Sequence, residues 1–325
     1  MDKKSLRIVF MGTPDFAVES LRQLVENGYQ VAGVVTMPDK AVGRHGSVLQ
    51  PSPVKQYAEK MGLPILQPEK LKDETFLREL KQLRADLQIV VAFRMLPDVV
   101  WDMPKYGTFN LHASLLPQYR GAAPINWAII HGERETGVTT FFLSHEIDTG
   151  RIILQRRLPI AETDDAGIVH DALMRLGASL TIETVDLLLA GNDVIDTTAQ
   201  ETLYQSESEL HPAPKLFKDT CRINWHRPAK KVYDFIRGLS PHPAAWTELQ
   251  VSENESIPLK IFQSAICPET HFLEPGIIRT DSKNLLEIAV EDGFIRLLSV
   301  QLAGKKRMTS KDFLNGNKHL LQRVK

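Results

Sequence analysis

The sequence lacks the features that mark membrane proteins, secreted proteins and disulfide scaffolds. Its 325 residues include two cysteines, Cys221 and Cys267, which lie far apart and outside any Cys-x-x-Cys motif, so neither a zinc ribbon nor a redox pair is expected. The central apolar run Ile89–Phe93 is far too short to span a bilayer. The N-terminal residues lack the apolar core and the cleavage site of a signal peptide. We therefore expect a cytoplasmic protein without a membrane partner.

Glycine-rich phosphate-binding loops are also missing. Residues 11–17, Met-Gly-Thr-Pro-Asp-Phe-Ala, hold one glycine where the Gly-x-Gly-x-x-Gly fingerprint requires three. No Gly-x-x-x-x-Gly-Lys-Ser/Thr motif occurs either. The sequence therefore disfavours a nucleotide-binding Rossmann enzyme.

The charge is close to balanced over the whole chain but unevenly distributed. The formal net charge is −1, yet residues 1–210 carry 21 basic and 28 acidic side chains, whereas residues 211–325 carry 18 and 12. Charge alone is best explained by a solvated basic surface on the C-terminal part. A polyanionic partner held by that part is the alternative, and it becomes attractive if the N-terminal part supplies chemistry.

Short apolar runs alternate with helical patterns over the first 190 residues, which is typical of an α/β domain. The pattern predicts a Rossmann-like, mostly parallel sheet with helices on both faces. The expected strands are Leu6–Met11, Val31–Thr36, Leu87–Phe93, Gly107–His112, Gly137–Ser144 and Ile152–Ile160. The expected helices are 15–27, Val54–Met61, Asp73–Arg84 and Gly167–Leu189. Met37–Pro53, which holds three prolines and two glycines, predicts an unusually long and hence functional loop.

The pattern changes after residue 190. Residues 191–209 are polar and predict a linker. Beyond them, short β-like runs and one helix predict a small β-barrel or sandwich; these are Leu259–Gln263, Gly276–Arg279, Leu285–Ala289 and Phe294–Val300, with the helix at Ala229–Arg237. We therefore expect an N-terminal domain over 1–190, a linker over 191–209 and a C-terminal domain over 210–325.

Candidate chemistry lies at the end of the strand Gly107–His112. Side chains alternate along a strand, so Asn110 and His112 share one face and project at the carboxyl edge, where ligands of α/β sheets bind. Taken alone, His112 is better explained as a hydrogen-bonded core histidine and Asn110 as a strand-end residue. Asp148 lies between two expected strands and by itself is typical of a turn.

Together, this amide, imidazole and carboxylate suit acyl transfer to an amine. The amide of Asn110 donates to a developing oxyanion, the imidazole of His112 shuttles a proton, and the carboxylate of Asp148 orients the histidine or accepts a proton. No serine or cysteine nucleophile is required when the substrate's own amine attacks. An aspartic protease is excluded, because it needs two Asp-Thr-Gly loops on an all-β scaffold and this chain has one.

These residues stand in segments that resemble the signature of folate-dependent formyltransferases. The likeness is carried by residues 110–117, Asn-Leu-His-Ala-Ser-Leu-Leu-Pro, followed by Tyr119–Ile125. Residues 148–150, Asp-Thr-Gly, are similar to the segment that holds the family's catalytic aspartate. Residues 11–16, 38–55 and 303–308 extend the resemblance over nearly the whole chain.

The resemblance implies transfer of the formyl group of 10-formyltetrahydrofolate to the α-amine of methionyl initiator tRNA by a monomer that needs no metal. It implies that Asn110 and His112 bind the carbonyl oxygen of the tetrahedral intermediate. Asp148 would position His112 or, through a water, take a proton from the amine. Ser114, Leu115, Leu116 and Pro117 would border the folate, and the backbone of Phe93, Arg94, Met95 and Leu96 would contact the pterin. Arg94 stands where relatives commonly have glycine.

The resemblance also implies how tRNA is held. The C-terminal domain would be an OB-like barrel that binds the tRNA backbone, and Arg44 in the long loop would meet the acceptor end. The phosphate contacts would come from Lys305, Lys306, Arg307 and Lys311. An exposed loop arginine and a solvated basic edge are the alternatives for these residues.

Other functions remain open at this point. A formyltransferase acting on glycinamide ribonucleotide usually lacks a basic second domain, and one acting on an amino-sugar nucleotide is typically fused to a domain with a glycine fingerprint. A formyl-folate hydrolase would use water in place of the amine. A non-catalytic RNA-binding protein on this scaffold is the alternative from a different class, and it would not require Asn110, His112 and Asp148 together.

Overall fold

The computed structural model describes residues 2–42, 48–191, 195–251, 255–317 and 323–324. The chain divides into two compact units, each described separately. The first unit comprises Met1–Gly121, Thr136–Leu158 and His170–Pro212, and the second comprises Ala122–Glu135, Pro159–Val169 and Ala213–Lys325. Both units therefore contain pieces of the expected N-terminal domain. The division into 1–190, 191–209 and 210–325 stays a prediction from the sequence.

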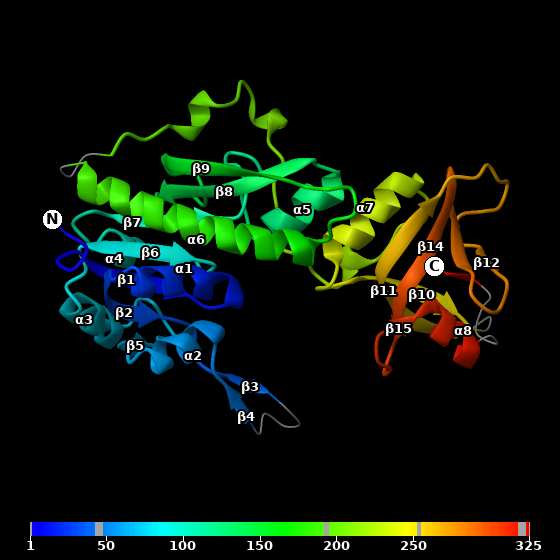
Figure 1. Ribbon diagram of the computed structural model, residues 1–325, viewed down its shortest axis with the longest axis horizontal. Helices are drawn as coiled ribbons and strands as arrows, with labels where there is room; N and C mark the ends of the chain where they lie inside the picture. The colour runs from blue at the N-terminus through cyan, green and yellow to red at the C-terminus, as the bar shows by residue number, and fades with distance from the viewer. Residues whose placement is uncertain (1, 43–47, 192–194, 252–254, 318–322, 325) are drawn as a thin grey trace. The chain divides into compact units, whose positions relative to one another are not determined.

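The first unit is built on a mixed sheet whose strands are mostly parallel (Figure 1). In spatial order the strands are β5 Ile65–Leu66, β2 Gln30–Val35, β1 Arg7–Gly12, β6 Leu87–Val91, β7 Thr108–His112, β8 Glu135–Phe142 and β9 Ile152–Pro159. The pairs from β5 to β7 are parallel, and β8 runs antiparallel to β7. The predicted fold class is confirmed.

Helices cover this sheet because each has one apolar stripe. They are α1 Asp15–Glu26, α2 Pro53–Lys60, α3 Glu74–Gln82, α4 Asp98–Trp101 and the part of α6 (Ala166–Ala190) that begins at His170. Val9 and Met11 of β1 pack in the core that includes Phe76 and Leu80 of α3. On α6, Thr184 bonds to Thr140 of β8, and Phe16 of α1 lies beside His170. The helix ends follow local chemistry: Asp73 caps α3 and Gly28, at φ 77°, follows α1.

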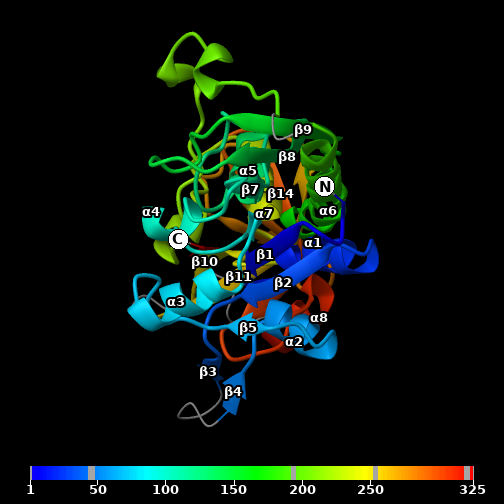
Figure 2. The same cartoon turned by 90° about the vertical axis from the view of Figure 1, so that its left-hand side faces the viewer.

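Two local expectations for this unit were wrong. Residues 37–53 are not one irregular loop, because Lys40–Val42 (β3) and Val48–Gln50 (β4) pair as an antiparallel hairpin. Apolar side chains on both strands favour this pairing, and Figure 1 and Figure 2 both show the hairpin extending from the unit. The strand β6 ends at Val91, two residues before Phe93, because Ala92 takes a positive φ of 47°.

The second unit carries an antiparallel sheet that nearly closes on itself. Its strands are β10 Ala245–Gln250, β11 Ser256–Cys267, β12 Ile278–Thr280, β13 Leu286–Val290, β14 Gly293–Leu302, β15 Met308–Thr309 and β16 Arg323–Val324. They are ordered β12-β13-β14-β11-β10-β16, and Arg323 of β16 also bridges to Ile277 before β12. This closure confirms the predicted barrel-like C-terminal sheet. The helices α5 Pro124–His131, α7 Ala229–Leu239 and α8 Ser310–Asn317 complete the unit.

The segment expected to be a linker follows the first unit closely. Thr198 forms a two-way backbone bridge with Ile152 of β9. Short 3₁₀ turns follow at Gln200–Thr202 (η2) and Glu207–Glu209 (η3), with a later one, η4 Asp219–Cys221, in the second unit. Across the described ranges, the search for a helix with the length and apolarity of a membrane span finds none.

Candidate active site

Strand β7 carries the two polar side chains at the centre of the candidate site. It lies between β6 and β8, so its backbone is bonded on both sides and fixes where its side chains point. His112, its last residue, is buried at 6% exposure, and Asn110 precedes it by two positions on the same face. The expected placement of both residues at a carboxyl strand end is therefore observed.

The two ring nitrogens of His112 have different surroundings. Nε2 lies 2.9 Å from the carbonyl oxygen of Tyr119. A carbonyl oxygen only accepts, so this contact assigns the hydrogen to Nε2. Nδ1 then carries the lone pair of the neutral ring, and it lies 3.8 Å from Oδ2 of Asp148. That separation exceeds the length of a direct hydrogen bond.

Asp148 is held in a tight loop between β8 and β9. Its backbone takes a positive φ of 56°, a conformation that non-glycine residues rarely adopt. Its side chain is 13% exposed, and Oδ2 accepts a hydrogen bond of 2.9 Å from the backbone N–H of Gly121. The structure thus brings Asp148 and His112 together across 36 residues of sequence, with the carboxylate already anchored.

The amide of Asn110 has unused hydrogen-bonding capacity. Its Oδ1 atom is buried and has no hydrogen-bond partner among the described residues. Buried polar atoms are nearly always paired, and this one shares a strand face with His112, so it is a candidate contact for a ligand. Rotation of the amide presents either its oxygen or its N–H₂ to that ligand.

The segment 114–117 forms a supported turn directly after β7. The Ser114 hydroxyl donates to the carbonyl of Gln118, and the Ser114 carbonyl accepts from Thr139. Leu116 packs with Phe141 and Ile152. Ser114, Leu116 and Pro117 are buried, and Leu115 is partly exposed. The turn is therefore rigid, and its buried side chains act chiefly as its internal support.

The segment 93–96 follows β6 as a loop. The Arg94 guanidinium donates to the carbonyls of Glu69, at 2.8 Å, and of Pro68, and burial lowers its pKa. Met95 is 75% exposed, whereas Leu96 is buried in the core beneath α3. The Arg94 side chain therefore binds the backbone of a neighbouring loop. Nothing in the sequence indicated this contact.

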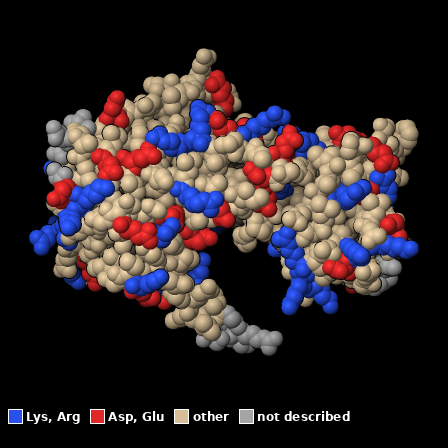
Figure 3. All heavy atoms as spheres, in the orientation of Figure 1, with Lys and Arg blue, Asp and Glu red and all other residues tan. Residues whose placement is uncertain are grey.

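The expected basic contacts lie in different parts of the chain. Arg44 is outside the described residues. Lys305, Lys306 and Arg307 are exposed in the turn between β14 and β15, and Lys311 is exposed on α8. Figure 3 shows Lys and Arg side chains gathered where β14 turns toward β15. Arg307 differs from the lysines, because Nε donates to Ser299 and the guanidinium lies 4.5 Å from the Phe262 ring.

Two contacts of the site were missed by the sequence reasoning. The Tyr119 carbonyl and the Gly121 N–H are backbone groups, and no residue type signals which backbone group will face a side chain. The only indication in the sequence was that both residues lie in Tyr119–Ile125, which is part of the stretch that resembles the formyltransferase signature. Within the described ranges, no group of three His, Cys, Asp or Glu side chains converges as metal ligands.

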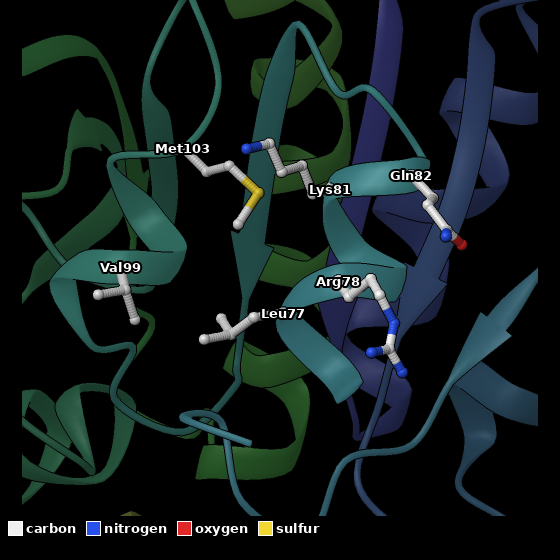
Figure 4. Close-up of a pocket in the computed structure, with 6 residues that line it drawn as sticks. All are labelled: Leu77, Arg78, Lys81, Gln82, Val99 and Met103. Carbon is white, nitrogen blue, oxygen red and sulfur yellow. The ribbon is translucent and has the colours of Figure 1, made fainter. Parts of the chain in front are cut away.

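A separate surface hollow of about 390 Å³ lies between α3 and α4 (Figure 4). Leu77, Val99 and Met103 form its apolar part. Lys81 extends from α3 toward Met103, whereas Arg78 and Gln82 extend away from it. None of the predicted site residues lines it.

Comparisons with known proteins identify the family of the chain. The family model "Formyl transferase" matches residues 6–185, and "Formyl transferase, C-terminal domain" matches 215–318. A Parabacteroides distasonis protein named methionyl-tRNA formyltransferase is 67% identical over 322 residues, which is 99% of both chains. A Porphyromonas gingivalis protein of the same name is 54% identical over 97% of both chains.

Solved structures show the same fold at low identity. An N-formyltransferase from Helicobacter canadensis, in complex with folinic acid and dTDP-3-aminofucose, gives a TM-score of 0.63 at 22% identity, over 90% of this chain and 98% of that one. HypX from Aquifex aeolicus with tetrahydrofolic acid gives 0.62 at 19% identity; 97% of this chain matches 47% of HypX. With two family models and full-length relatives matched, the chain belongs to the formyl transferase family.

Proposed function

We propose that the chain transfers the formyl group of 10-formyltetrahydrofolate to the α-amine of methionyl initiator tRNA, which supplies formylmethionyl-tRNA for translation initiation. The observation that carries the chemistry is the buried Oδ1 atom of Asn110, which has no hydrogen-bond partner among the described residues, on the strand face that it shares with His112 of the His112–Asp148 pair. The acceptor is supported by full-length relatives at 54–67% identity that are named methionyl-tRNA formyltransferase.

The reaction forms one C–N bond and breaks another. The methionyl amine attacks the formyl carbon, the carbonyl oxygen takes up negative charge, and the bond to N10 of the folate then breaks. The amine loses a proton and N10 gains one, so no further reactant is needed. A free α-amine has an ordinary pKa of about 7.7–8, and a substantial fraction is therefore unprotonated near neutral pH.

Each proposed catalytic residue has a role in this reaction. The Asn110 amide N–H₂ donates to the developing oxyanion. His112 works through Nδ1, because Nε2 is bound to the Tyr119 carbonyl. Nδ1 either accepts the proton of the amine or, once protonated, donates to the oxyanion. Asp148, 3.8 Å away, stabilises the charged ring or receives the proton through a water.

We assign the formyl donor to the carboxyl edge beside β6 and β7. The backbone of Phe93–Leu96 would contact the pterin, and the rigid turn Ser114–Pro117 would border the folate. The complexes of the HypX and Helicobacter proteins with tetrahydrofolic and folinic acid support a folate donor. For the acceptor, Arg44 would meet the acceptor end, and Lys305, Lys306, Arg307 and Lys311 would contact phosphates. The protein would act as a cytoplasmic monomer.

A competition assay tests this function. Purified protein and 10-formyltetrahydrofolate are mixed with methionyl initiator tRNA, an amino-sugar nucleotide and glycinamide ribonucleotide, and formyl incorporation into each is measured. Formylation of the tRNA in preference to both small amines supports the proposal. Formylation of a small amine alone, or formate release without transfer, overturns it. Size-exclusion chromatography with light scattering tests the monomer.

A further inference from the structure

The segment that leaves α6, expected to be a free linker, binds back along the candidate site through a buried glutamine. Gln200 has an exposed fraction of 0% although it stands among exposed polar neighbours. In Figure 1 this stretch follows α6 and passes beyond β9. A fully buried polar side chain in a polar segment calls for an explanation in its hydrogen bonds.

Gln200 uses all of its hydrogen-bonding capacity within the site. Its Nε2 group donates to the carbonyls of Asp148 and Gly150, both at 2.8 Å. Its Oε1 atom accepts from Nε and Nη2 of Arg120, at 3.1 and 2.7 Å. Two donated and two accepted bonds are the maximum for an amide, so this side chain is fixed in one orientation. It ties the loop of Asp148 to the loop that follows β7.

The loop of Asp148 needs such support. Its positive φ is an unfavourable conformation for a non-glycine residue, which persists only when its surroundings impose it. At Gly150 a side chain would collide with the carbonyl oxygen of Phe142, so the loop has little freedom to rearrange. The two bonds from Gln200 fall on the carbonyls of these two residues.

The same segment also holds the other partner of His112. The backbone N–H of Tyr119 donates to the carbonyl of His211 at 2.7 Å. Gln118 bonds to this segment twice, accepting from the N–H of His211 and donating to the carbonyl of Glu209. Tyr119 supplies the carbonyl that fixes Nε2 of His112. Residues 197–211, here called the strap, therefore secure the groups that face both ring nitrogens.

We propose that Gln200 is a positioning residue that sets the distance between Asp148 and His112. The proposal rests on the proposed function, since it gives Gln200 a role through Asp148. A shift of the carboxylate by about an ångström lowers catalysis without weakening ground-state binding, because the substrates do not bind through Gln200.

Two substitutions and one control test this role. Gln200→Glu retains an acceptor for Arg120 but loses the N–H₂ group that donates to Asp148 and Gly150. Gln200→Met removes all four hydrogen bonds at similar volume. Glu201→Ala changes an exposed neighbour in the strap and is the matched control. We expect kcat to fall about 10–100-fold in both Gln200 variants, with KM for folate and tRNA within about twofold. The control should match the unaltered protein.

A double-mutant cycle separates positioning from a general structural role. If Gln200 acts through Asp148, single-turnover rates of Asp148→Ala and Asp148→Ala/Gln200→Glu should be equal within error. Additive losses, a rise in KM with kcat unchanged, or unaltered kcat in both Gln200 variants would overturn the inference. Thermal melting monitors folding, and failure of both Gln200 variants to fold at the assay temperature also counts against it. Full activity of Asp148→Ala would instead refute the proposed catalytic role of Asp148.

Discussion

Nδ1 of His112 and Oδ2 of Asp148 lie 3.8 Å apart, while the opposite ring nitrogen is bound to the Tyr119 carbonyl. The two sides of the imidazole therefore differ in their surroundings. One ring nitrogen is held by a backbone carbonyl, and the other faces a carboxylate that lies beyond direct hydrogen-bonding distance.

Replacing His112 should abolish formyl transfer. We expect His112→Ala to lower kcat/KM at least ~100-fold, because general acid–base catalysis and oxyanion stabilisation are both lost. Single-turnover transfer to methionyl initiator tRNA measures this loss, and circular dichroism checks the fold. His226→Ala, at an exposed position of the second unit, is the control and should retain full activity. Near-normal turnover of His112→Ala would refute the proposed catalytic role of His112.

Asn110→Asp should separate the shape of the Asn110 side chain from its chemistry. The variant keeps the volume but replaces the N–H₂ donor with a carboxylate that repels a developing oxyanion, so we expect kcat to fall by about 10²–10³-fold. Stopped-flow or quench measurements of transfer test this. The comparison variant is Asn224→Asp, whose exposed side chain keeps its contact with the backbone of His226. Equal rates for Asn110→Asp and the native chain would exclude oxyanion stabilisation by this amide.

The basic turn between β14 and β15 should contribute to the salt dependence of tRNA binding. We expect the double variant Lys305→Ala/Lys306→Ala to weaken binding and to reduce the slope of log K against log salt by about 1 per lysine removed. Binding titrations at several salt concentrations give this slope. Lys72→Ala/Lys81→Ala, on the surface of the first unit, provides the matched loss of charge. An unchanged slope would show that these two lysines do not contact tRNA phosphates and that the turn is a solvated surface.

The buried carboxylate of Glu287 should make the stability of the second unit sensitive to acid. Burial acts to raise the pKa of Glu287, but hydrogen bonds from Arg296 and Arg279 outweigh it and hold the pKa below its ordinary value. The resulting stabilisation is complete above the unfolded-state pKa of about 4.3 and is lost as pH falls through the lower folded-state pKa.

Glu287→Gln tests that linkage. At neutral pH we expect a loss of roughly 1–3 kcal/mol, because both guanidinium groups lose a charged partner while remaining partly hydrated. The difference from the unaltered chain should shrink below about pH 4. Urea unfolding across pH measures it, and Glu291→Gln, at an exposed turn, is the control. A difference that is independent of pH would contradict the pKa assignment.

Local residue patterns were sufficient to predict most elements of the fold. Apolar runs located β1, β2, β7 and β14 to within a few residues, because a buried strand requires apolar residues at regular positions in the sequence. The hairpin β3–β4 was missed because the three prolines and two glycines of residues 37–53 are typical of a loop, and pairing between two three-residue strands leaves little local signal.

The candidate site was predictable in its residue types but not in its connections. Asn110 and His112 follow from strand alternation at a sheet edge. Asp148 was a candidate from its place between two expected strands and from the resemblance, and it reaches His112 only through the folding of the β8–β9 loop. Gln200 carried no signal at all, because a glutamine in a polar stretch is ordinarily solvated.

The amino-acid sequence by itself determined the α/β class and the barrel-like C-terminal sheet, because periodicity and residue type are local properties. It identified Asn110 and His112 only as candidates at one strand end. Tertiary structure decided which nitrogen of His112 holds its hydrogen, how Asp148 is anchored, and that the polar stretch after α6 binds back to the site. Those features depend on hydrogen bonds between residues far apart in the chain, many of them to backbone atoms, and backbone atoms are the same in every residue.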